Sequence, residues 1–208
     1  MYDYITDGQK IYDKSFATIR SEAQLSNIPT DLEKIAVRII HACGMIDIVD
    51  DMAFSAKAGT IGRNAINQGK AILCDAEMVA KGITKSRLTA NNSVICTLHD
   101  ERVSDHALII NNTRSAAAVE FWKPFIKNSI VAIGNAPTAL FHLLNLIEQG
   151  FDKPALIIGC PVGFVGAKES KIALENNVFD IPYIVVHGRR GGSAMAAAAV
   201  NALASEKE

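Results

Sequence analysis

Arg38 and His41 are the residues whose types and spacing first suggest chemistry, because they lie three positions apart in an otherwise apolar segment, residues 34–51 (KIAVRIIHACGMIDIVDD). Positions i and i+3 of a helix share a face. A helix this apolar is buried on most sides, so a guanidinium and an imidazole on one flank need internal partners or a ligand in a cleft. An imidazole titrates near neutral pH. The sequence leaves open whether His41 is satisfied inside the core or faces a ligand.

Three turns that are rich in Gly or Pro form a second group of candidates: residues 134–140 (GNAPTAL), 159–170 (GCPVGFVGAKES) and 188–196 (GRRGGSAMA). In each, an expected strand leads into a helix start, where free backbone N–H groups and the helix dipole favour an anion. Ordinary turn chemistry also uses Gly and Pro. Pro137 suits a first helical position, and Ser193 could cap the last helix. All three turns at one sheet edge favour a ligand cleft at a topological switch point. None is a GxGxxG fingerprint or a Walker P-loop.

Other polar residues could line the same edge. Asp75 closes the first expected strand and could instead cap the helix that follows. Arg114 opens a helix, where the dipole disfavours a cation unless an anion is also present, although plain surface solvation is the alternative. Arg189 and Arg190 lie in the last loop, and His187, at the end of the last strand, could be structural or functional. The histidines to which we assign no role are His99, His106 and His142.

The elements that must position these residues alternate between short strands and helices after residue 70. Short runs rich in β-branched residues, mostly followed by helical segments, predict a parallel sheet that is buried on both faces. We therefore expect an α/β fold with three α/β/α layers and five parallel strands, at residues 71–75, 93–98, 129–134, 155–159 and 182–188. The fold should be one domain, with a mainly helical part at residues 1–69 and a core at residues 70–208.

The N-terminal part is expected to be helical throughout, with no strand before residue 70. Tyr2 to Glu22 is predicted to form one helix. Thr30 and Glu33 have the spacing of a capping box at the start of the next helix. These helices would cover one side of the sheet or reach a second subunit.

Composition excludes several classes of function. The 208 residues are 49% hydrophobic and 21% charged, with a net charge of -1 and no basic run, so a nucleic-acid partner is not expected. The apolar stretches are too short to span a membrane, and the start lacks a signal-type apolar region, so the expected location is the cytoplasm. The cysteines show no CxxC spacing and are expected to be reduced core residues. The sequence predicts no metal site: His41 and Cys43, two apart on a helix, point in different directions.

Seven segments in order resemble one enzyme family: IYDKSFATIR, RIIHACGMID, AILCDAEMVAKGI, NTRSAAA, AIGNAPTALF, GCPVGFVGAKES and GRRGGSAMAAAAVNALA. The chain resembles the precorrin-8X methylmutases of cobalamin biosynthesis, including cobalt-precorrin-8 members, from about Tyr4 to Ala204. The resemblance implies an isomerase that moves a methyl group between neighbouring carbons on ring C of a corrin precursor, giving hydrogenobyrinate or its cobalt equivalent, cobyrinate. It also implies a flavodoxin-like sheet, a homodimer with active sites near the subunit interface, and no cofactor.

The resemblance assigns roles to individual residues. The family's catalytic histidine falls on His41, as proton donor and acceptor to the macrocycle, and substrate contacts fall on Ser15 and Arg38. The substrate is an apolar macrocycle fringed with carboxylates, which suits arginines and backbone N–H groups on an apolar floor. We therefore add as substrate-binding candidates Arg114, Gly134, Asn135, Gly163 and Arg189. Cys160 and His187 depart from the family pattern, in which methionine and arginine are more usual.

Two other functions fit the same sequence features. A noncatalytic corrinoid carrier would share the pocket but would bind substrate and product without converting them. A phosphate- or nucleotide-binding enzyme on the same fold would use the Gly-rich loops for phosphate and be protected by nucleotides. The sequence does not separate a metal-free from a cobalt-containing substrate.

Overall fold

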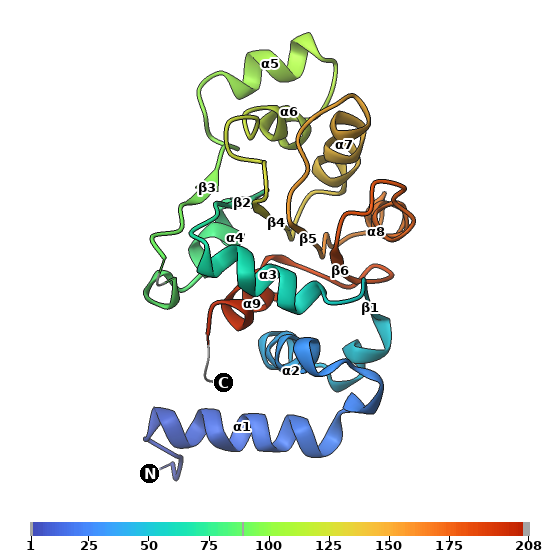
Figure 1. The fold of residues 1–208 in the computed structure, drawn as a ribbon. Coiled ribbons are helices and arrows are strands. Elements are labelled where there is room, and N and C mark those ends of the chain that lie inside the picture. The colour runs from blue at the N-terminus through green and yellow to red at the C-terminus, as the bar shows by residue number, and fades with distance from the viewer. Residues whose placement is uncertain (1, 89, 206–208) are drawn as a thin grey trace.

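The fold is built on one sheet of six strands with helices on both faces (Figure 1). The computed structural model describes residues 2–88 and 90–205. Along the sheet the strands follow the order β1-β6-β5-β4-β2-β3. Their bounds are Met52–Phe54 for β1, Ile72–Cys74 for β2, Val94–Cys96 for β3, Ile130–Ile133 for β4, Leu156–Gly159 for β5 and Tyr183–Val186 for β6.

Strands β2 to β6 run parallel to one another, as the sequence predicts. Numbered from β2 along the chain, their order across the sheet is 2-1-3-4-5, which is the flavodoxin-like order. β2, β4 and β5 are buried along their whole length, because helices cover both faces. The order reverses between β2 and β4, so the carboxyl ends of these two strands form the topological switch point.

The prediction of only five strands, with none before residue 70, is wrong, because β1 adds a strand at the edge of the sheet. β1 runs antiparallel to β6, with Met52 opposite Val186 and Phe54 opposite Ile184. Three residues are too few to show an alternating pattern, and the sequence MAF has no β-branched residue. The expected helical N-terminal part therefore also contributes to the sheet.

The helices form a layer on each side of the sheet. Helices α2, α3, α4 and α9 cover one face, and α6, α7 and α8 cover the other (Figure 1). α5 packs on α6, and α1 lies outside α2. The helix bounds are Gly8–Glu22 (α1), Thr30–Cys43 (α2), Ala58–Asn67 (α3), Glu77–Gly82 (α4), Val103–Ile109 (α5), Arg114–Glu120 (α6), Pro137–Glu148 (α7), Ala167–Glu175 (α8) and Ser193–Leu203 (α9). Short 3-10 helices are Leu25–Asn27 (η1), Ile46–Asp51 (η2) and Lys85–Arg87 (η3).

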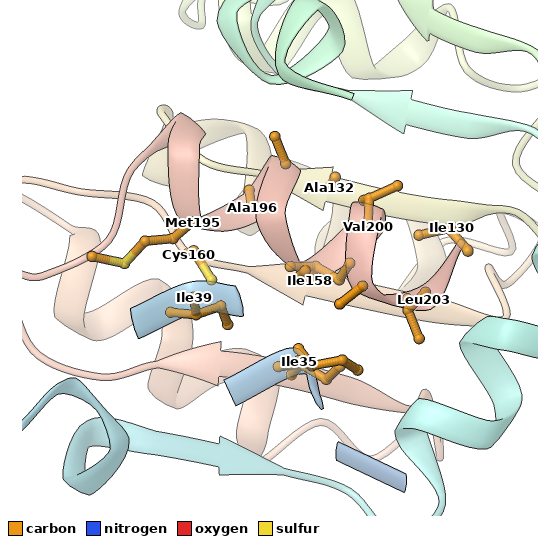
Figure 2. Packing of buried hydrophobic residues seen from close by; sticks show 14 of the residues in the cluster. Ile35, Ile39, Ile130, Ala132, Ile158, Cys160, Met195, Ala196, Val200 and Leu203 are labelled. Carbon is orange, nitrogen blue, oxygen red and sulfur yellow. The ribbon is translucent and has the colours of Figure 1, made fainter. Parts of the chain in front are cut away.

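The core beneath α2 is its contact with α9, and this contact positions Arg38 and His41. Figure 2 shows Ile39 of α2 near Met195 and Ile35 closer to Leu203, with Ile158 of the sheet beside them. The amino group of Lys34, at the start of α2, donates to the carbonyl of Ser205, just beyond α9. The two helices therefore run in opposite directions, and the alanines of α9 allow them a close approach.

Two predicted helix starts in the N-terminal part are wrong. α1 begins at Gly8 rather than Tyr2, because the carboxylate of Asp7 accepts hydrogen bonds from the backbone N–H groups of Gln9 and Lys10 and caps the helix there. The capping box at Thr30 does not form, because Pro29 precedes the helix and Thr30 is already its first residue. Glu33 instead pairs with Arg20 of α1. That ion pair joins α1 to α2.

At the carboxyl edge, one expected helix start is confirmed and one is wrong. Pro137 is the first residue of α7. Ser193 does not cap α9: Gly192 precedes the helix with φ 129°, and the buried hydroxyl of Ser193 has no hydrogen-bond partner among the described residues.

Membrane and thiol features agree with the composition. In residues 2–88 and 90–205, no helix is both long and apolar enough to cross a membrane. The cysteines are free thiols: Cys74 and Cys160 are buried, and Cys43 and Cys96 are half-buried.

Candidate active site

His41 lies at the end of α2 and is held by one face of α1. The Ser15 hydroxyl lies 2.8 Å from Nδ1 of the imidazole. The rings of Tyr12 and Phe16 lie 5.5 and 5.1 Å from the imidazole centroid. Because Ser15 occupies Nδ1, Nε2 is the ring nitrogen that the described residues leave for a ligand.

Arg38 lies one turn before His41 and has an unusual environment for a charged group. It is only 7% exposed, its guanidinium lies 5.2 Å from the centre of the Phe16 ring, and its Nε has no hydrogen-bond partner in the described chain. Burial, and then the neighbouring charge of Arg87, lower the pKa of Arg38, while Tyr12 acts in the opposite direction. A buried cation without an anion is costly, so this site is suited to a negatively charged ligand.

A cavity of about 260 Å³ lies beside these two residues, between α1, α2, α4 and α9. Its floor is the small-residue face of α9. The side chain of Asn201 fixes that floor by accepting from the Thr84 N–H and donating to the Gly82 carbonyl. The lining residues are Tyr12, Arg38, His41, Ala42, Gly82, Ala194, Ala197, Ala198 and Asn201.

The surroundings of His41 favour its neutral form. Partial burial, and then repulsion from Arg38, lower the pKa of His41, which favours the neutral imidazole at pH 7. An anion bound at Arg38 would offset the repulsion and raise the proton affinity of His41. The pair therefore couples ligand charge to protonation of the imidazole.

The switch point predicted as a ligand cleft is closed by an internal carboxylate. Asp75, which is 3% exposed, accepts hydrogen bonds from the N–H groups of Gly134 (2.9 Å), Asn135 (2.9 Å) and Ala136 (2.7 Å). Burial raises the pKa of Asp75, and these three hydrogen bonds oppose the rise. The backbone N–H groups of Gly134 and Asn135 are therefore already occupied, and only the exposed side chain of Asn135 remains for a ligand.

The other predicted substrate contacts are not among the residues that line the His41 cavity. Gly163 donates its N–H to the carbonyl of Arg189 (3.2 Å), and the exposed Arg189 guanidinium lies 5.1 Å from the centre of the Phe164 ring. Arg114, also exposed, starts α6 and lies 3.4 Å from the Leu98 carbonyl. The structure thus brings together Ser15, Arg38 and His41. The lining of the cavity beside them does not include Arg114, Gly134, Asn135, Gly163 or Arg189.

Two histidines that we assigned no role share a partner. Glu120 lies 2.7 Å from Nε2 of His106 and 2.9 Å from Nε2 of His142, linking α5, α6 and α7. Burial acts to raise the pKa of Glu120, but the two histidine contacts outweigh it and lower the pKa. His187 pairs with Glu175 at 3.0 Å. No group of three His, Cys, Asp or Glu side chains arranged to hold a metal ion occurs within the described ranges.

Comparison with known proteins gives the family. The family model described as CbiC, precorrin-8X methylmutase, matches residues 10–206. The chain belongs to this family. It is 62% identical to the precorrin-8X methylmutase of Pseudomonas aeruginosa over 208 residues, covering 100% of both chains. It is 39% identical to the cobalt-precorrin-8 methylmutase of Leptospira interrogans over 203 residues, covering 94% of this chain and 92% of that one.

The fold comparison agrees. A crystal structure of precorrin-8X methylmutase from Thermus thermophilus superposes with a TM-score of 0.86 at 37% identity, covering 95% of each chain. The methylmutase family consists of isomerases that catalyse methyl migration in cobalamin biosynthesis.

The aromatic residues around His41 were not predicted from the sequence. Tyr12 and Phe16 lie three residues before and one after Ser15, so the three share one face of α1. That spacing was visible in the sequence. The part of the cavity lining that comes from α9 could not be predicted, because an alanine-rich helix that only covers a sheet has the same pattern.

Proposed function

We propose that this protein is a precorrin-8X methylmutase that moves a methyl group between neighbouring carbons on ring C, giving hydrogenobyrinate, with His41 as proton donor and acceptor. The observation that carries the assignment is the buried Arg38, whose Nε has no hydrogen-bond partner among the described residues. It lies beside an imidazole that Ser15 orients in an apolar cavity. Family membership supports the reaction.

The proposed mechanism uses the coupling between Arg38 and His41. A substrate carboxylate binds the Arg38 guanidinium and offsets the repulsion that, after burial, lowers the pKa of His41. His41 then carries a proton on Nε2, while Ser15 engages Nδ1. Protonation of the macrocycle makes ring C electron-poor and eases methyl migration, and His41 takes the proton back afterwards.

The cavity supports binding of one edge of the substrate rather than all of it. About 260 Å³ is below the range of about 300–1,000 Å³ for sites that enclose a drug-sized ligand, and a tetrapyrrole is larger than that. The remainder would extend past Tyr12, which is 45% exposed. We propose that the outer carboxylates meet Arg114, the Gly163 loop, Arg189 or the side chain of Asn135.

A homodimer would help to enclose the substrate. Ile11 and Tyr12 are exposed on α1 next to the cavity, and a second subunit at this face would bury them with the macrocycle. Sedimentation of the purified protein tests this, since a monomer at micromolar concentration contradicts it.

The metal-free substrate is the first to test. The relative with 62% identity is named for precorrin-8X, and the one with 39% identity is named for cobalt-precorrin-8. We therefore assign precorrin-8X as the substrate, with cobalt-precorrin-8 as the alternative.

The deciding experiment is anaerobic incubation with each substrate, followed by absorption spectroscopy, for the wild type, His41→Ala and a matched control, His99→Ala. His99 is exposed and lies in no described cavity lining. Because His41 is the proposed acid and base, its variant should lose about 10²–10⁴-fold in kcat, and the control should not change. Turnover of His41→Ala within about threefold of wild type contradicts the assignment. Tight binding of both substrates without conversion by the wild type supports the carrier instead.

A further inference from the structure

Lys171 on α8 is a fully buried lysine that the proposed mechanism does not use. Its amino group donates to the carbonyl of Pro161, after β5, at 3.0 Å and to the carbonyl of Arg190, after β6, at 2.7 Å. Burial lowers the pKa of Lys171 to about 8, against the opposing effects of Cys160 and Asp51. Lysine is almost never fully buried without a partner, so this costly placement calls for a reason.

The contacts of Lys171 fix the orientation of two peptide groups, Pro161–Val162 and Arg190–Gly191. In a planar trans peptide the C=O and the next residue's N–H point in opposite directions. With the carbonyls of Pro161 and Arg190 directed at Lys171, the N–H groups of Val162 and Gly191 point away from it. Neither N–H group donates a hydrogen bond within the described part of the chain.

Further contacts hold the two loops together. Gly192 donates to the Cys160 carbonyl at 2.8 Å, and Gly163 donates to the Arg189 carbonyl at 3.2 Å. A Cβ on Gly191, which has φ 154°, would lie 2.3 Å from the Cys160 carbonyl oxygen, so only glycine fits this approach. The loops therefore form one unit with Lys171 beneath it.

This unit is also connected to the catalytic helix. The guanidinium of Arg190 pairs with Asp47 (2.7 Å) and Asp51 (3.4 Å) in η2, which follows the end of α2. On its other side the loop after β6 leads directly into α9, whose Ala194 lines the His41 cavity. The two loops are thus directly connected to the segment after α2 and to α9.

We propose that Lys171 is a positioning residue for substrate binding, which holds the two loops so that the N–H groups of Val162 and Gly191 face outward to receive a carboxylate beside Arg189. The nature of the carboxylate ligand rests on the proposed function. The arrangement of the loops does not.

The test compares Lys171→Met, which keeps the aliphatic stem, with Lys168→Met, an exposed lysine on the same helix. Hydrogen exchange in residues 160–166 and 188–192 reports on the loops, and hydrogenobyrinate titration and steady-state kinetics report on the site. We expect Lys171→Met to speed loop exchange, and to raise KM and the product Kd about tenfold with kcat within about threefold. Lys168→Met should match wild type.

Lys171→Gln is the conservative variant, because its amide still donates to one carbonyl. It should raise KM only about threefold, and it carries the test if Lys171→Met does not fold. Loop exchange equal to that of Lys168→Met in both variants overturns the inference, as does a fall in kcat with KM unchanged. Failure of the wild type to convert either substrate overturns the proposed function alone, because the exchange comparison still tests Lys171.

Discussion

The Gly-rich loops at the carboxyl edge of the sheet are organised by buried ions of opposite charge. After β4, the carboxylate of Asp75 accepts three backbone N–H groups from residues 134–136. After β5 and β6, the ammonium of Lys171 donates hydrogen bonds to two backbone carbonyls. In the loop after β4 the backbone N–H groups point inward to Asp75. In the loops after β5 and β6 we infer that the N–H groups of Val162 and Gly191 point outward.

The difference teaches that a Gly-rich turn does not by itself determine whether an anion site is open. Both regions have the local chemistry that favours an anion. An internal group from elsewhere in the chain decides: Asp75 ends β2, and Lys171 lies within α8. One loop has its anion built in, and the others remain available for an external one.

The largest effect should follow from removing the built-in anion. Asp75→Ala leaves three N–H groups without their acceptor, two of them in buried hydrogen bonds and one in a half-buried one. The free energy of unfolding should therefore fall by about 3 kcal/mol or more in urea titrations. The matched control is Asp152→Ala, in an exposed ion pair with Lys127, which should change stability by less than about 0.5 kcal/mol.

A rescue measurement completes this first prediction. Formate has the size of the deleted carboxylate, and it should raise the melting temperature of Asp75→Ala and not that of wild type. Equal effects of formate on both proteins would mean that the loop has no anion preference of its own.

A smaller effect should come from the buried cation, and it should depend on pH. Folded Lys171 loses its proton near pH 8, whereas an unfolded lysine keeps it to about pH 10.5, so the unfolded state binds more protons between these values. The unfolding free energy of wild type should therefore rise from pH 8 to 10 relative to Lys171→Met, by about 1–3 kcal/mol. Denaturant titrations at several pH values measure the difference, and parallel curves would show that Lys171 keeps an ordinary pKa.

The smallest effect is expected on KM, from exposed side chains of the loop after β6 and of the loop after β4. Arg189→Ala should raise KM about fivefold because it removes a cation beside the outward N–H groups, whereas Asn135→Ala should change KM less than about twofold. Steady-state kinetics on both variants gives the comparison. A larger effect at Asn135 would place the substrate at the Asp75 loop and reverse the assignment of the open side.

Much of the fold follows from local sequence. The five parallel strands were predictable because each is a short, β-branched run next to a helical segment. β1 was not, since Met52–Phe54 becomes a strand only by pairing with β6. The start of α1 was missed because Asp7 competes with earlier residues for the cap, and the register of a helix start is weakly specified by composition.

The site was predictable only within one helix. Arg38 and His41 share a face of α2 by spacing alone. That Ser15 would reach His41 depends on how α1 packs against α2, which no local pattern encodes. The hydrogen bond from the Gly134 N–H to Asp75 was also not predictable, because Asp75 could equally have capped the helix that follows it.

The pairing of β1 with β6, and of α2 with α9, also has a consequence for how the chain assembles during synthesis. The strand β1 and the helix α2 that carries His41 are made early, yet their respective neighbours β6 and α9 are made last. Until then the side of α2 that packs on α9 is uncovered and is exposed to aggregation or to a chaperone. Such long-range contacts slow folding. A chain released before residue 193 would therefore lack the floor of its cavity and the support for its catalytic helix.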